Sequence, residues 1–200
     1  MNLPGSVAGK AMGALRQFGS EGREWAEGKF PYFRALLWLF FLYVFVRHLS
    51  DADYGSIFSG INLGVHELGH VILSFMPMFI MVAAGTLFQI AAPVASVFVF
   101  LRQRDFFALS ASFGWLSTSL FGVSRYAGDA QEMELPLVSP FGGGDITHDW
   151  NYMLSKLGIL GAAPAVSAFF WILGFLSMAV ALLWGGYLLA VMIRTAKNPS

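Results

Sequence analysis

The 200-residue sequence predicts an all-α membrane protein, a multi-pass transmembrane helical bundle of about five spans, or six if glycines break the last one. Composition is the first reason: hydrophobic residues make up 56% of the chain and charged residues 12%, about half the share of a soluble domain. The second is pattern, because apolar stretches alternate with short polar turns, and a helix needs roughly 20 apolar residues to cross a membrane. The 12 basic residues balance 12 acidic ones, which indicates no nucleic-acid partner.

The N-terminal residues 1–31 are polar and contain several glycines. They predict an extramembrane tail with a short amphipathic helix that lies on the lipid headgroups. Residues 32–200 are predicted to form a single transmembrane domain. Its first span covers residues 33–46, and Arg47 anchors the end of this span at the membrane surface.

Four further apolar segments complete the predicted bundle. Pro77 interrupts the second span, and the polar turn 102–105 separates the third span from the fourth. The last segment is longer than a hydrocarbon core is thick, so we expect one long tilted span, unless Gly174 or Gly185 marks a break. The four segments cover residues 57–76, 82–101, 106–123 and 160–193.

The third span carries a polar residue on a defined face. Gly85, Gln89 and Pro93 are spaced four apart, so they share one side of the helix. A glutamine inside a membrane usually forms a hydrogen bond to another helix. We therefore expect Gln89 either to orient a substrate carbonyl or a histidine, or to join two helices.

The longest polar stretch is a predicted loop over residues 124–149. Loops of this length are uncommon unless they are functional or disordered. The glycine run 142–144 favours function, because it lets the chain bend sharply and re-enter a cavity. Asp149 then suits the N-cap of a helix over residues 150–157.

The second span contains the strongest motif, His66-Glu67-Leu68-Gly69-His70. Residues four apart stand on one face of a helix, so His66 and His70 can bind a single metal ion. In the H-E-x-x-H motif of zinc hydrolases the glutamate, here Glu67, takes a proton from water and returns one to the leaving group. Ionisable groups in a membrane cost about 2.5–3.5 kcal/mol each when charged, so their chance occurrence here is disfavoured. Asn62 and Gln89 are candidate substrate-contacting or supporting residues.

A catalytic zinc ion takes three protein ligands, and the absence of cysteine leaves only histidines and carboxylates for the third. Proteases with a third histidine soon after the motif need glycine and histidine where this chain has Leu73 and Met76, so that subclass is excluded. His48 stands at a membrane boundary, where polar residues are common. We therefore favour His148, which precedes a helix able to dock on the second span, with Asp149 as its neighbour or as the alternative third ligand.

These features together resemble the site-2 protease family of intramembrane zinc metalloproteases. The residues that carry the resemblance are the motif at 66–70, the later span with Gly85, Gln89 and Pro93, and an acidic turn before a closing helix. In that family the third ligand is an aspartate in a Leu-Asp-Gly type of turn at the start of a late helix. The corresponding segment here is 147–151, Thr-His-Asp-Trp-Asn.

The motif and the resemblance predict a Zn²⁺-dependent metalloprotease that hydrolyses peptide bonds within or near the bilayer. Its partners would be membrane lipids and a transmembrane or membrane-proximal protein substrate. Composition and the lack of cysteine fit an integral protein of a bacterial inner membrane. The alternatives are a metal-binding membrane protein with a transport or structural role and no hydrolysis, and a scaffold whose histidines are only packed polar residues.

Overall fold

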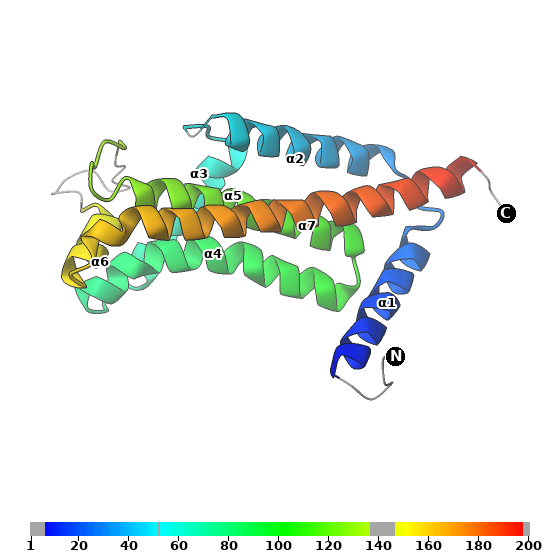
Figure 1. The fold of residues 1–200 in the computed structure, drawn as a ribbon, viewed down its shortest axis with the longest axis horizontal. Helices are drawn as coiled ribbons and strands as arrows, with labels where there is room; N and C mark the ends of the chain where they lie inside the picture. Colours follow the sequence, from blue (N-terminus) through cyan, green and yellow to red (C-terminus); the bar gives the residue numbers. More distant parts are fainter. Residues whose placement is uncertain (1–6, 52, 137–146, 198–200) are drawn as a thin grey trace.

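The computed structural model describes residues 7–51, 53–136 and 147–197, and these residues form helices and connecting turns, without a β-strand (Figure 1). The prediction of an all-α helical bundle is confirmed. The helices are α1 (Val7–Ala26), α2 (Tyr32–Ser50), α3 (Ile57–Ile72), α4 (Met78–Gln103), α5 (Phe106–Gly128), α6 (Asp149–Lys156) and α7 (Ala163–Lys197), with a 3-10 turn (Leu160–Ala162) before α7.

Four helices in the described part of the chain are long and apolar enough to cross a membrane, one fewer than the five predicted. They are α2, α4, α5 and the segment 160–196, which covers the 3-10 turn and all but the last residue of α7. The predicted second span corresponds to α3, which has 16 residues and ends at Ile72. At 1.5 Å per residue it is about 24 Å long, shorter than a hydrocarbon core of about 30 Å. Helix α7 continues through Gly174 and Gly185 without a break, so the alternative of six spans does not arise.

Helix α5 lies at the centre of the bundle and packs along α7 (Figure 1). Three serine hydroxyls of α5, one every seven residues, donate hydrogen bonds to backbone carbonyls of α7, and we call this set the serine ladder. The pairs are Ser110 to Ala181 at 2.7 Å, Ser117 to Gly174 at 2.7 Å and Ser124 to Ser167 at 2.8 Å. Because lipid provides little hydrophobic drive between helices, such polar contacts help to hold membrane helices together.

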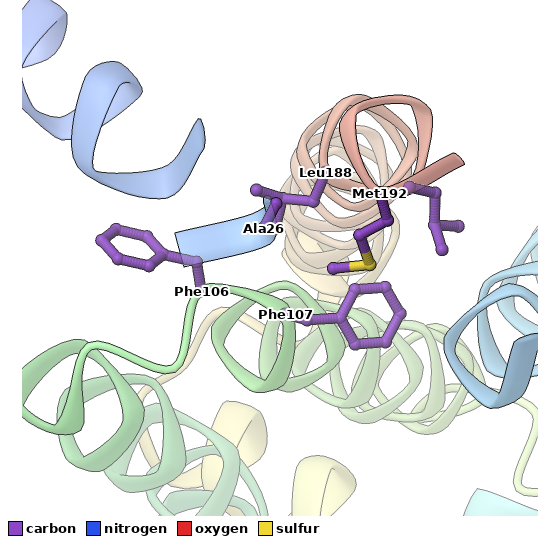
Figure 2. Packing of buried hydrophobic residues seen from close by; sticks show 6 residues of the cluster. Ala26, Phe106, Phe107, Leu188 and Met192 are labelled. Carbon is purple, nitrogen blue, oxygen red and sulfur yellow. The ribbon is translucent and has the colours of Figure 1, made fainter. Parts of the chain in front are cut away.

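The N-terminal helix α1 packs against the bundle at the end away from α6 (Figure 1). Ala26 at the end of α1 is buried with residues from the start of α5 and the last part of α7. Figure 2 shows Phe106 and Phe107 pointing to opposite sides of α5, with Phe107 beside Met192 and Ala26 beside Leu188. The polar N-terminal segment therefore contains a helix with a protein contact of its own.

Helices α3 and α4 form a closely packed pair joined by a short turn at Pro77. Their approach depends on Gly69, because a Cβ atom there would overlap the carbonyl group of Ala84. Gly60 and Gly64 face open space, so only one of the three glycines of α3 serves this contact. Helix α6 lies at the end of the bundle where α4 begins, which brings its first residues towards α3 (Figure 1).

The polar loop begins later than predicted, because α5 extends to Gly128. Residues 129–136 form turns at the end of this helix. The glycine run 142–144, to which the sequence assigned a sharp bend, lies outside the described residues.

Candidate metal centre

Two histidines of α3 and a glycine of α4 form the base of the candidate site. His66 and His70 stand one helical turn apart and both face α4. A Cβ atom on Gly85 would lie 2.5 Å from His66 Nε2 and 2.6 Å from His70 Nε2. Real atoms do not approach so closely, so only glycine at position 85 leaves room for both imidazole rings.

Asp149, the first residue of α6, completes a three-residue cluster. One of its carboxylate oxygens, Oδ2, lies 2.8 Å from His66 Nε2 and 3.1 Å from His70 Nε2. The three side chains each offer one ligand atom, and these atoms lie within 4.8 Å of one another. His66 and Asp149 are buried, and His70 is partly buried. The cluster thus has the residue types and the compactness of a metal site.

Hydrogen bonds to the other ring nitrogens determine how the two histidines are protonated. His70 Nδ1 lies 2.8 Å from the backbone carbonyl of Met81, which can only accept, so Nδ1 is the donor. His66 Nδ1 lies 3.1 Å from Gln89 Oε1. The amide of Gln89 cannot be flipped, because its nitrogen donates to the carbonyl of Ser119 at 3.2 Å. His66 Nδ1 is therefore also a donor.

A neutral imidazole that carries its proton on Nδ1 presents a lone pair at Nε2. Both Nε2 atoms of the cluster consequently point lone pairs at the same carboxylate oxygen. Burial raises the pKa of Asp149, but rings that carry an extra proton on Nε2 would donate to its carboxylate, and this contact lowers the pKa of Asp149 below its ordinary value. Three acceptors meet without a donor between them. Either extra protons on both rings or a bound cation must stabilise this arrangement. Histidines that bind a metal typically donate a hydrogen bond from their other ring nitrogen, as both rings do here.

His148, the third ligand that the sequence favoured, does not join the cluster, and Asp149, the alternative, lies there in its place. His148 is the N-cap of α6, one residue earlier than predicted, and its Nδ1 accepts the backbone N–H of Asn151 at 3.2 Å. Its Nε2 then carries the proton and donates to Asp129 Oδ2 at 3.2 Å. Both ring nitrogens are used in holding the start of α6, and the alternative residue, Asp149, takes the third place.

His48, the remaining histidine, also lies apart from the cluster. Its ring stacks on Phe121, with centroids 4.7 Å apart, and meets the edge of the Tyr54 ring at 5.0 Å. His48 is thus a packed residue near the end of α2.

Glu67 lies beside the cluster on α3 and is partly buried. Its carboxylate acts electrostatically on His70 and on Tyr126, which places it near both. Among the described residues it has no hydrogen-bond or ion-pair partner. The oxygens of this carboxylate can therefore accept a hydrogen bond or a proton from a bound molecule.

Asn62 lies one turn before His66 and belongs to the contact between α3 and α5. Its Oδ1 accepts from Trp115 Nε1 at 2.8 Å and from Ser119 Oγ at 3.0 Å, and its Nδ2 donates to Thr118 Oγ1 at 3.4 Å. Of the two supporting residues that the sequence indicated, Gln89 contacts a histidine of the cluster directly. Asn62 contacts Gln89 only through Ser119. It accepts from the hydroxyl of Ser119, and Gln89 donates to the carbonyl of the same residue.

Two groups near the cluster escaped the sequence analysis. The carbonyl of Met81 is a backbone atom, which no residue pattern could reveal. Tyr126 fell in the predicted polar loop because the fourth span was ended too early. Its hydroxyl accepts the backbone N–H of Asp149 at 3.0 Å, and its ring centroid lies 5.9 Å from that of His66.

Comparison with protein-family models, with curated proteins and with solved structures gives no match for this chain. The geometry of the site is therefore the evidence for function. The donor set, two imidazole nitrogens and one carboxylate oxygen, fits zinc, which commonly takes three protein ligands of these types in catalytic sites.

Proposed function

We propose that this chain is a membrane-embedded zinc metallopeptidase that hydrolyses peptide bonds of transmembrane or membrane-proximal proteins. The observation that carries the proposal is the convergence of two histidine lone pairs on the Asp149 carboxylate, next to Glu67 of an H-E-x-x-H motif, which has no partner among the described residues. The resemblance to site-2 proteases supports it, because an aspartate at the start of a late helix is the third ligand that the resemblance implies.

The residues that would hold the metal are His66 and His70, through Nε2, and Asp149, through its carboxylate. Zinc in a site with three protein ligands supplies Lewis-acid activation of water and of a carbonyl group. Gln89 and the Met81 carbonyl hold the rings with Nε2 free for binding. Gly85 leaves the space that the rings occupy.

Glu67 is the proposed general base. Its carboxylate would take a proton from the water that attacks the amide carbon and then deliver it to the amide nitrogen as the C–N bond breaks. A group with this task must be near the reacting atoms without being a ligand itself. Glu67 meets this condition, because it follows His66 directly but is not part of the three-residue cluster.

The apolar helices support a membrane as the setting of the proposed reaction. The four candidate spans support a multi-pass protein, and we propose a bacterial inner membrane as its location, with membrane lipids around it. A substrate helix must unwind before cleavage, because its backbone carbonyls are already hydrogen-bonded. Helix α3 is shorter than a full span, which allows water and an unwound segment to reach the site from one side of the membrane.

The experiment compares wild type with Glu67→Gln expressed at equal level in bacterial cells. Mass spectrometry of membrane proteins should find new chain termini within or near transmembrane segments in cells with wild type only, because the amide cannot act as a base. Zinc content of the two purified proteins should be equal. Identical termini in both strains would contradict the proposed mechanism.

The same experiment separates hydrolysis from the alternative of a metal-binding protein without hydrolysis. A transport or structural site would hold zinc in both proteins and produce no new termini in either. Uptake of zinc into vesicles that contain the wild-type protein would then assign transport.

A further inference from the structure

Tyr126 lies in the last turn of α5, beside the candidate metal centre but outside the ligand set. Its ring is packed between two histidines, with centroid distances of 5.9 Å to His66 and 4.4 Å to His148. Its hydroxyl oxygen accepts the backbone N–H of Asp149 at 3.0 Å. The phenol is therefore held in place by the same residue that completes the cluster.

The hydrogen bond from Asp149 determines which way the phenol O–H can point. A phenol oxygen accepts and donates in different directions close to the plane of its ring. Because the backbone N–H of Asp149 occupies the accepting side, the hydroxyl proton is directed away from that N–H. No acceptor for this proton is present among the residues that the structure describes.

The surroundings of this hydroxyl are acidic. The carboxylates of Asp149, Glu67 and Asp129 all act on it electrostatically, and none of them forms a hydrogen bond with the phenol oxygen. The cluster and its neighbours thus contain several acceptors, and the phenol of Tyr126 contributes a neutral donor beside them. A fixed donor of this kind is what a developing negative charge on a substrate oxygen requires.

We propose that Tyr126 is a further catalytic residue, whose O–H donates a hydrogen bond to the carbonyl oxygen of the amide under attack; this role rests on the peptidase function proposed above. As water adds to the carbonyl carbon, the C=O π electrons move to oxygen, which becomes negatively charged. Glu67 takes the proton of the water and delivers it to the amide nitrogen, the C–N bond breaks, and the C=O bond re-forms. Tyr126 keeps its proton throughout and stabilises only the charged oxygen.

The test uses zinc-loaded protein in detergent and two leucine-rich peptide probes with the same side chains. One contains a phosphinic group, whose tetrahedral charged oxygens mimic the attacked amide. The other ends in a thiol, which binds zinc but has no such oxygen. Tyr126→Phe should weaken binding of the phosphinic peptide about 100- to 1,000-fold, the range for removal of one oxyanion donor, and should leave thiol binding within about twofold.

The matched control is Tyr152→Phe, because Tyr152 lies on α6 close to Asp149 in sequence and its ring packs on Phe79. This variant should bind both peptides as wild type does. Equal weakening of both peptides by Tyr126→Phe, or loss of zinc, would show that the hydroxyl only holds Asp149, and would overturn the proposal.

The outcomes also separate this proposal from the proposed function. If the wild type binds both peptides and Tyr126→Phe binds them equally well, the role of Tyr126 is contradicted but the peptidase function is not. Wild type that holds zinc but binds neither peptide would contradict the peptidase function, and the role of Tyr126 with it.

Discussion

The serine ladder between α5 and α7 and the metal centre between α3, α4 and α6 both bury polar groups, but they balance them differently. In the ladder each hydroxyl donor meets a carbonyl acceptor, at 2.7–2.8 Å. In the metal centre two imidazole nitrogens and a carboxylate oxygen, all acceptors, lie within 4.8 Å of one another. A matched set needs nothing more, whereas a set of acceptors needs a cation or extra protons.

The surroundings of the acceptors reinforce this contrast. Gln89 is itself fully matched, since its oxygen accepts from His66 and its nitrogen donates to the Ser119 carbonyl. The imbalance is thus confined to the three atoms that face one another. Thr86 and Trp150 nearby also carry a buried polar atom without a partner among the described residues, but each stands alone, whereas the centre brings three acceptors together.

Of the three substitutions considered, Gly85→Ala should have the largest effect, which is on the zinc content of the metal centre. The added Cβ would lie 2.5 Å from His66 Nε2, so the rings must move and the cluster opens. We expect zinc content, measured by elemental analysis, to fall from about one per chain to near zero. Gly64→Ala is the matched control, because a Cβ there meets nothing within 4 Å. Equal zinc in both variants would contradict the geometry of the cluster.

Changing Gln89 to leucine should have an intermediate effect. It removes the acceptor that keeps the proton of His66 on Nδ1, so the ring no longer presents its Nε2 lone pair reliably. Zinc affinity, measured by competition with a chelator, should fall about 10- to 100-fold. Thr86→Val on the same helix is the control, since this buried hydroxyl has no partner among the described residues. A Gln89→Leu variant with the zinc affinity of wild type would contradict the role of Gln89 in orienting His66.

Changing Ser117 to alanine should have the smallest effect, on stability alone. One hydrogen bond between membrane helices contributes about 0.6 kcal/mol on average and up to about 1.7 kcal/mol. Unfolding in mixed detergent should therefore show a small loss, with zinc content unchanged. Ser112→Ala is the control, because that hydroxyl bonds within α5, to the Ala108 carbonyl. Loss of zinc in Ser117→Ala would mean that the ladder and the centre are coupled.

Apolar composition and turn residues were enough to predict the helical fold and most helix positions. The failure at α3 has a physical reason: the apolar pattern runs on through residues 73–76, but the helix ends at Ile72, ahead of Pro77. Hydropathy alone does not show where an apolar segment stops being helical. The predicted second span therefore corresponds to a helix shorter than the four candidate spans.

The site could be predicted in part. His66, His70 and Glu67 follow from a local motif, because helix periodicity places i and i+4 on one face. The third member depends on how α6 docks, and adjacent residues such as His148 and Asp149 point to different sides of a helix start. Only the contacts of each residue distinguish them. The Met81 carbonyl and the hydroxyl of Tyr126 also depend on tertiary packing.

The most direct test of the central claim is the zinc content of three detergent-purified proteins: wild type, Asp149→Asn and His148→Asn. Asparagine at 149 keeps the shape but removes the charged ligand, and asparagine at 148 can still cap α6. The account predicts about one zinc per chain in wild type and in His148→Asn, and little or none in Asp149→Asn. Full zinc in Asp149→Asn, or its loss in His148→Asn, would contradict it.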